Sequence, residues 1–408
     1  MSKPLVFRSV SARATGHKLD LDLALALGRA LVRLSPVLLL ASCGGGSIES
    51  TVPTVNTITI LGTPSYGQNT QVVVTGTALD QGISVQSSAC NRNATLLTTA
   101  PTASDARTAY FQIPCAEVAV GTVTAGVFRD SSGLSLGTTT YNVATPVTSI
   151  AVVGTPLYGQ SLQLVVNGTF LDDGVRVQSA GCQSLTRAPI TDRTRATFQC
   201  AVATVGSFTA NALVGASTTP SASTTFSVPT PQVTMTVGNG SNSLGSFVIT
   251  LDPARAPITV NNFLNYVNTR WYEGVVFHRN SPGFVLQGGG FNSGLNPASA
   301  VPAVKTPNAN IVLEDNAGLL NLQWTVAMAR TNAPDTANSQ FFINLVNNPF
   351  LDRSTTARGY AVFGNVTAGT GVITTLTAAP CVAYPALVGS GECLPFPNLV
   401  ITSATQTR

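Results

Sequence analysis

The sequence predicts a mainly β protein with more than one domain, and three observations support this fold class. Short β-forming runs recur along most of the 408-residue chain, separated by Gly, Asn and Asp turn signals. One of its segments occurs twice in succession. After the second copy, two strand-like runs and a helix-like run open a longer C-terminal region. We therefore expect two small β-sandwich repeats followed by a larger β domain.

Composition limits the classes of function. Hydrophobic residues make up 44% of the chain, which is enough to bury cores in about two to four domains. Charged residues make up only 9%, and the net charge of +4 is not gathered into a basic run. A nucleic-acid surface normally needs such a run with interleaved aromatic residues, so we expect no nucleic-acid partner.

The N-terminal segment 1–42 is predicted to be a leader with a secretory signal. Arg29 and Arg33 precede an apolar run that ends in Leu40, and small residues then lead to Cys43. This order resembles a bacterial lipoprotein signal, which implies that Cys43 is acylated and becomes the first mature residue. An ordinary cleaved signal or a buried segment are the alternatives. Gly44 favours the outer membrane, so we expect a lipid-anchored envelope protein that faces the periplasm.

Seven cysteines leave one unpaired, and lipidation of Cys43 would account for it. Export to an oxidising compartment would allow the other six to form disulfides between sequence neighbours. The expected pairs are Cys90 with Cys115, Cys182 with Cys200, and Cys381 with Cys393.

The internal repeat divides the middle of the chain. Gly62 to Gln68 returns as Gly154 to Gln160, and the same offset of 92 aligns Cys90 with Cys182. The copies are immunoglobulin-like only in a loose sense, because the cysteines lie too close together to join two sheets. We expect each bridge to hold a local hairpin or loop. We interpret the repeats as spacers or protein-binding modules. The predicted boundaries are a tether at 43–54, repeats at 55–145 and 146–228, and a linker at 229–232.

The final domain, 233–408, begins with a predicted hairpin and helix. Val233–Val237 and Ser246–Leu251 flank a turn of Asn, Gly and Ser residues. A helix then opens in the stretch that starts at Asp252, because four apolar residues recur at helical spacing from Val260 to Val267. A second helix is expected near 371–379.

Two segments of this domain carry the functional information. Val275 to Phe291 places an arginine among apolar residues before three glycines, and Ala327 to Phe342 ends in Gln340, Phe341 and Phe342. Together they resemble the site-forming segments of the cyclophilins, which are peptidyl-prolyl cis/trans isomerases. The resemblance implies an eight-stranded antiparallel barrel with a helix over each end. It also implies a shallow groove that accepts proline-containing polypeptides.

The resemblance assigns roles residue by residue. Arg279 matches the arginine that hydrogen-bonds the substrate carbonyl and approaches the prolyl nitrogen, and the polar Gln287 and Gln340 match groups that orient it. The remaining matches are to substrate-binding positions, namely Phe284, Val285, Ala329, Arg330, Phe342, Phe350, Leu351 and Tyr360. Ala329 and Arg330 are expected on a strand from Val326 to Arg330. Because isomerisation breaks no bond to carbon or oxygen, we expect neither cofactor nor metal.

Other features of the motif have structural interpretations. The glycines at 288–290 lack the pattern of a phosphate-binding loop, so we expect them to permit a bulge and a close backbone approach. His278 is expected to point away from the substrate. Asn280 and Ser281 are polar where aliphatic residues are usual. Arg330, Phe350 and Tyr360 look like a bacterial periplasmic subgroup, which puts cyclosporin binding in doubt more than catalysis.

The predicted function is therefore peptidyl-prolyl isomerisation that assists the folding of exported proteins, by a chain expected to be monomeric. The alternative is an envelope interaction protein whose barrel binds proline-containing partners without significant catalysis. The intact set of groove residues, Arg279 first among them, favours the enzyme.

Overall fold

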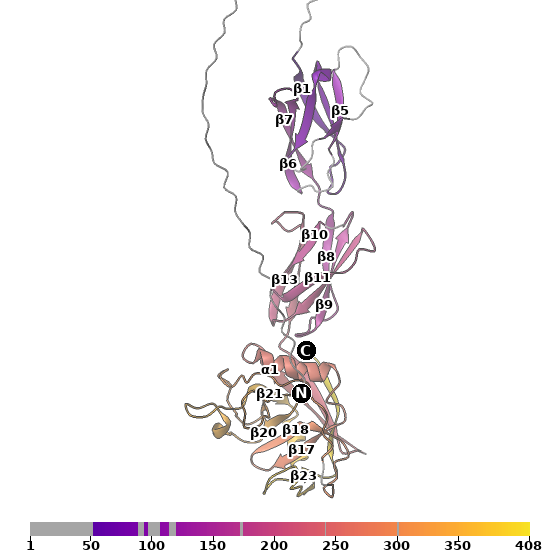
Figure 1. Ribbon diagram of the computed structural model, residues 1–408. Coiled ribbons are helices and arrows are strands. Elements are labelled where there is room, and N and C mark those ends of the chain that lie inside the picture. The colour runs from indigo at the N-terminus through magenta and orange to yellow at the C-terminus, as the bar shows by residue number, and fades with distance from the viewer. Residues whose placement is uncertain are drawn as a thin grey trace, which may run out of the picture. The chain divides into compact units, whose positions relative to one another are not determined.

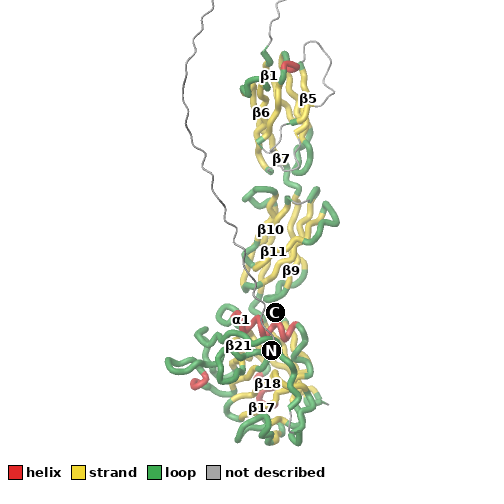
Figure 2. Tube along the Cα trace, viewed as in Figure 1, coloured by secondary structure: helices red, strands yellow, loops and turns green. Residues whose placement is uncertain are grey.

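The computed structural model describes residues 52–88, 94–96, 107–113, 120–171, 174–240, 242–299 and 302–408. These residues form 24 strands and two α-helices, together with two short 3-10 helices (Figure 1). Strands and the loops between them dominate the trace (Figure 2), so the predicted mainly β class is confirmed. The predicted leader and Cys43 lie outside the described residues. Within those residues, none of the helices combines the length and the apolar character that a bilayer crossing requires.

The first repeat consists of two antiparallel sheets with the strand orders β1-β2-β5-β4 and β3-β6-β7. Buried and exposed residues alternate along its strands, as at Val72 and Val74 of β2, so one face of each sheet contributes to the core. Its strands are β1 Thr54–Leu61, β2 Thr70–Thr77, β3 Ile83–Ser87, β4 Thr95–Leu96, β5 Thr108–Ile113, β6 Gly121–Arg129 and β7 Ser135–Val143, with the 3-10 helix η1 at Leu79–Gln81.

The second repeat reproduces this topology. Its sheets have the orders β8-β9-β12-β11 and β10-β13-β14, the same as in the first repeat when each strand number is raised by seven. Gly76 and Gly168 show the equivalence in detail. A Cβ atom at either position would lie 1.9 Å from a backbone oxygen, that of Thr54 or Pro146. The strands are β8 Val147–Val153, β9 Ser161–Gly168, β10 Val175–Gln178, β11 Cys182–Arg187, β12 Arg195–Val202, β13 Gly206–Val214 and β14 Ala222–Val228.

A disulfide joins Cys182 to Cys200 across the neighbouring strands β11 and β12, with a Cα–Cα distance of 5.2 Å. This bridge holds a local hairpin, as its short sequence separation predicts. The corresponding prediction for the first repeat, Cys90 with Cys115, lies outside the described residues.

The C-terminal domain is a closed eight-stranded barrel with the order β15-β16-β21-β19-β20-β18-β17-β24, and all of its pairings are antiparallel. The predicted hairpin is its first strand pair. The strands are β15 Gln232–Gly238, β16 Ser243–Leu251, β17 Val275–Ser281, β18 Val285–Asn292, β19 Thr325–Met328, β20 Phe341–Asn344, β21 Val362–Ala368 and β24 Leu399–Gln406. Closure leaves no free sheet edge in the ring.

Two helices accompany the barrel, α1 at Pro257–Asn268 and α2 at Thr370–Thr377. The predicted start of α1 was too early, because the stretch from Asp252 forms turns and the helix begins at Pro257, where a missing N–H costs nothing. Two N–H groups of its first turn, those of Ile258 and Thr259, donate to the carboxylate of Glu314. The buried face of α1 then packs aromatic residues against the barrel interior, with the rings of Phe263 and Phe341 5.6 Å apart.

Candidate active site

Three adjacent barrel strands bring the predicted motif residues together. On β17 and β18, Arg279 lies opposite Gln287, and on β18 and β20, Gln287 lies opposite Phe342. Phe342 in turn lies opposite Ala327 of β19. Cross-strand neighbours of this kind share one face of the sheet, so the antiparallel register sets an arginine, a glutamine and a phenylalanine in a row.

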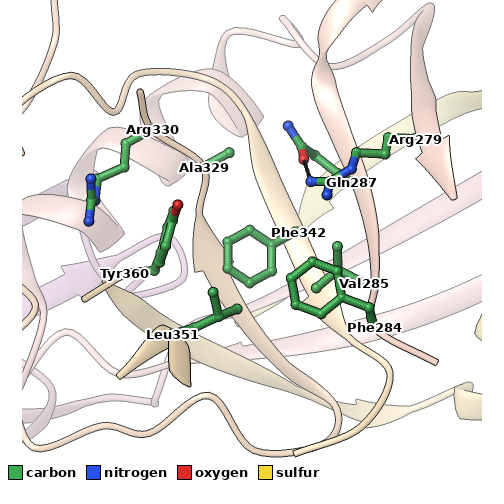
Figure 3. A pocket seen from close by; sticks show the side chains of 9 residues that line it. All are labelled: Arg279, Phe284, Val285, Gln287, Ala329, Arg330, Phe342, Leu351 and Tyr360. Atoms are coloured by element: carbon green, nitrogen blue, oxygen red, sulfur yellow. Dashed lines mark hydrogen bonds between the residues drawn. The ribbon is translucent and has the colours of Figure 1, made fainter. Parts of the chain in front are cut away.

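These residues border a pocket of about 250 Å³. Figure 3 shows Arg279 and Gln287 on one side of it, Arg330 and Tyr360 on the other, and the ring of Phe342 between them. Nine of the eleven predicted groove residues line it, and these are Arg279, Phe284, Val285, Gln287, Ala329, Arg330, Phe342, Leu351 and Tyr360. The two that do not, Gln340 and Phe350, lie directly beside lining residues, as described below.

The floor of the pocket is apolar. Val285, Phe342 and Leu351 belong to a separate cluster of buried side chains, against which Phe284 and Tyr360 pack. Leu351 comes from the 3-10 helix η2, Pro349–Leu351, and its carbonyl accepts a hydrogen bond of 2.9 Å from the N–H of Tyr360. Such a floor suits one small hydrophobic group.

The polar side of the pocket is a relay of side chains that ends at the arginine. Arg279 Nη1 donates to Gln287 Oε1 at 2.8 Å, and Gln287 Nε2 donates to Gln340 Oε1 at 3.0 Å. The guanidinium carbon of Arg279 also lies 5.6 Å from the centre of the Phe284 ring. Gln340 therefore affects Arg279 indirectly, by orienting Gln287, which contacts the arginine.

Sequence reasoning missed a further contact of Arg279. Its Nη2 group forms an ion pair with Glu392, and this hydrogen bond is the main reason why the pKa of the Glu392 carboxyl is lowered. Glu392 lies in the segment between Cys381 and Cys393, which form the second observed disulfide. The signal in the sequence was that Glu392 is the one charged residue of this segment.

The opposite side of the pocket carries a second arginine, which is held differently. Arg330 lies 4.5 Å from the centre of the Tyr360 ring, and its Nε and Nη2 groups donate to the carbonyl of Gly359 at 3.0 and 2.9 Å. The predicted strand was too long here, because β19 ends at Met328. Ala329 still pairs through its N–H with the Gln340 carbonyl, but Arg330 turns toward the 358–360 loop.

A buried carboxylate fixes that loop. Asp315 accepts hydrogen bonds from Arg358 at 2.7 and 2.8 Å, from Arg353 at 2.9 Å, and from the N–H of Gly359 at 2.8 Å. These contacts, led by the bond from Arg358, lower the pKa of Asp315 to about 2. The carboxylate therefore stabilises the backbone that carries Tyr360.

Phe350 forms an aromatic edge outside the pocket. Its side chain is 72% exposed, and its ring stacks on that of Phe284 with the centroids 5.5 Å apart. A substrate that extends beyond the pocket would meet this ring.

The glycine run and His278 have structural roles, as expected. Gly289 has φ of +89°, and a Cβ there would lie 2.5 Å from the carbonyl oxygen of Ser339, so only glycine fits. The register of β17 against β18 shifts twice nearby, which is the expected bulge. His278 is buried beside Phe291, and burial lowers its pKa to about 3, so the imidazole is neutral.

The site is thus an apolar pocket with a fixed arginine at its edge, set on a closed antiparallel barrel. Comparison with known proteins identifies the class. The model of the cyclophilin type peptidyl-prolyl cis-trans isomerase family matches residues 233–404.

Two bacterial relatives have similar sequences over this domain. Peptidyl-prolyl cis-trans isomerase A of Dickeya dadantii is 46% identical over 127 residues, which cover 31% of this chain and 63% of the relative. A peptidyl-prolyl cis-trans isomerase of Acinetobacter baylyi is 42% identical over 142 residues, which cover 35% of this chain and 72% of the relative. A crystal structure of a cyclophilin type isomerase of Cryptosporidium parvum is 21% identical, with a TM-score of 0.34, and the match covers 44% of this chain and 98% of that one.

Through its C-terminal domain, the chain belongs to the cyclophilin type peptidyl-prolyl cis-trans isomerases. The matches to these two relatives cover 31% and 35% of the chain, and the two β repeats lie outside the residues that the family model matches.

Proposed function

We propose that the barrel domain catalyses cis/trans isomerisation of X-Pro bonds, and that Arg279 stabilises the twisted amide. The observation that carries this proposal is a guanidinium fixed by Gln287 at the edge of a pocket with an apolar floor. The pocket suits a pyrrolidine ring, and Arg279 suits a carbonyl or amide group next to it.

Isomerisation of an X-Pro bond requires only that the barrier to rotation of the amide be lowered. The two planar forms of an X-Pro amide are close in energy, but rotation between them has a barrier of about 18–20 kcal/mol because the amide is conjugated. Rotation removes that conjugation, and the prolyl nitrogen becomes pyramidal and basic. A hydrogen bond from Arg279 to this nitrogen is available only in the twisted state. It therefore lowers the barrier without stabilising either planar ground state.

The substrates that this proposal names are polypeptides of the cell envelope. The sequence features that support it are the lipoprotein-like signal before Cys43 and the even number of remaining cysteines, two pairs of which are bonded. In this proposal Cys43 carries the lipid in the outer membrane, facing the periplasm, and the two repeats act as a stalk or a client-binding surface. Substitution of Cys43 by Ser should abolish incorporation of labelled palmitate in a bacterial host and release the protein from the membrane fraction.

The direct test of catalysis is a proline-isomerisation assay with the full chain and an X-Pro peptide. Arg279→Ala should lower kcat/KM about 100-fold, because the donor that we propose for the twisted amide is removed. Arg255→Ala is the matched control, since Arg255 is an exposed arginine of the same domain whose ion partner is its neighbour Asp252. A wild-type chain with no rate above the uncatalysed reaction would leave only the non-catalytic binding alternative.

A further inference from the structure

The segment between α2 and β24 brings a carboxylate to the arginine of the groove. Glu392 directly precedes Cys393, which is bonded to Cys381 at the start of the segment. The backbone of Cys393 pairs with that of Asn280, the neighbour of Arg279, through two hydrogen bonds of 2.8 and 3.0 Å. The position of Glu392 relative to β17 is therefore fixed both by the backbone pair and by the disulfide.

Small strands inside the segment add to this order. β22, Cys381–Val382, pairs with β23, Leu394–Pro395, on either side of the disulfide. Tyr384 and Leu394 are buried in a cluster with Val276 of β17. We call the part of the segment between the two cysteines the 381–393 loop. Through Tyr384 it is packed on the strand that carries Arg279.

Both carboxylate oxygens of Glu392 are engaged. Oε1 accepts from Arg279 Nη2, and Oε2 accepts from the N–H of Gly389 at 3.0 Å. The side chains of Arg279 and Glu392 are only 26% and 17% exposed. A partly desolvated pair with these extra hydrogen bonds fixes its members more firmly than an ion pair in open solvent.

The guanidinium is consequently held at two points. Gln287 occupies a hydrogen of Nη1 and Glu392 occupies a hydrogen of Nη2. Because the guanidinium is planar, two such contacts define its plane, and one hydrogen on each of these nitrogens stays available for a ligand. One contact alone would still allow the group to swing about that bond.

The carboxylate leaves the groove open. Glu392 is absent from the residues that line the pocket, whereas Arg279 and Gln287 are among them. It therefore contacts the arginine from outside the pocket. This geometry favours support of the arginine over obstruction of the site.

We propose that Glu392 is a positioning residue for Arg279, and that the 381–393 loop exists to hold its carboxylate against the guanidinium. The proposal rests on the proposed function, because its effect is measured on isomerisation. Loss of the Glu392 carboxylate leaves Arg279 in place but less well oriented toward the prolyl amide.

The test compares the full-length wild type with Glu392→Gln, which keeps the shape, and with Glu392→Ala. We expect kcat/KM to fall about 3-fold and about 10-fold respectively, within the range of coupling between contacting residues. Glu273→Gln is the matched control, because Glu273 pairs with the exposed Arg270. It should leave kcat/KM unchanged. Thermal unfolding of each variant checks that the barrel remains folded.

A second measurement separates positioning from a merely structural role. The double change Cys381→Ser and Cys393→Ser should lower kcat/KM in the wild type but add nothing in the Glu392→Ala background, if the disulfide acts through Glu392. In addition, hindered rotation of the Arg279 guanidinium should give separate Nη–H signals by NMR in the wild type, and these should merge in Glu392→Ala.

The outcomes are distinct. A wild type without activity ends the proposed function, and this inference with it. An active wild type whose Glu392→Ala variant is equally fast or faster overturns the inference alone. A disulfide effect that persists undiminished in the Glu392→Ala background also overturns it, because the loop would then act by another route.

Discussion

The two arginines on either side of the pocket differ in what holds them. Arg279 is oriented by two side chains, Gln287 and Glu392, and one of these comes from a disulfide-bounded loop. Arg330 donates mainly to backbone carbonyls, those of Gly359, Arg358 and Thr331, and lies over Tyr360. The orientation of Arg279 thus depends on side chains that a single substitution can remove. The orientation of Arg330 depends on backbone carbonyls, which a substitution does not remove.

The difference indicates a division of labour. Arg330 donates its hydrogens to backbone carbonyls and has few left for a substrate. It therefore contributes to the shape of the pocket rather than to hydrogen bonding with a ligand. Arg279, held by two side chains, keeps one hydrogen on each of its Nη nitrogens available, and its side chain borders the pocket (Figure 3). We therefore expect substitutions at the two positions to have unequal effects.

The largest effect should follow from replacing Arg279 by lysine, with the same replacement of Arg330 as the comparison. Arg279→Lys should lower kcat/KM about 100-fold, since an ammonium cannot reproduce the planar fork that contacts Gln287, Glu392 and the substrate together. Arg330→Lys should lower it only about 2-fold, because the shape of the pocket remains largely in place. Steady-state isomerisation kinetics check both, and similar losses at the two positions would contradict the comparison.

The carboxylate behind Arg330 should matter for stability. Asp315→Asn should lower the free energy of unfolding by about 2 kcal/mol, because the bonds from Arg353 and Arg358 lose their ionic partner. The folded pKa of about 2 lies below the ordinary 3.8. This contribution is therefore fully present above pH 3.8 and is lost as the pH falls toward 2. Urea titration measures it.

Asp252→Asn is the matched control for this prediction, since Asp252 pairs with Arg255 at an exposed site. It should change the free energy of unfolding by less than about 0.5 kcal/mol. Equal changes for the two variants would show that Asp315 does not anchor the loop.

A separate effect on stability concerns His278, the residue next to Arg279. Because the folded pKa of His278 is about 3 and its ordinary value is 6.5, the unfolded chain binds the extra proton first. Stability should fall below pH 6.5, by up to about 1.4 kcal/mol per pH unit. NMR of the imidazole should show no titration of His278 between pH 8 and 5. A midpoint near 6.5 would mean that this side of β17 is open to water.

The smallest effect is expected at the exposed aromatic edge. Phe350→Ala should raise KM about 2-fold for a peptide that extends past the proline, with kcat nearly constant, because the ring contacts the substrate without reaching the reacting amide. Peptides of two lengths provide the measurement. A fall in kcat with constant KM would place Phe350 in the chemistry.

Much of the groove was predictable from the sequence, because most of its residues lie within two short motifs whose strands are neighbours in the barrel. Arg279, Gln287 and Phe342 lie on paired strands, and the two short motifs contain eight of the eleven predicted groove residues. The sequence also indicated that the two repeats share one topology, because segments aligned at an offset of 92 form strands in the same order.

Other features depend on tertiary contacts that no local pattern encodes. Glu392 lies 113 residues after Arg279, in a segment that the family motifs do not include, so only the fold reveals their pairing. β19 ends at Met328, and the Arg330 side chain beyond it donates to the carbonyls of Gly359 and Arg358, contacts that a strand-forming sequence pattern does not encode. The same holds for Asp315, whose partners lie in the 353–359 loop.

The position of β24 in the ring has a consequence for the order of assembly. It follows every other barrel strand in the chain, yet it pairs with both β15 and β17, the latter at Val276 and Phe277. During synthesis, β17 therefore keeps an unpaired edge after all the other groove strands have been made. We expect the arginine to reach its working position only when Leu399–Gln406 has been delivered, so that an interrupted chain exposes two unpaired strand edges and has no functional groove.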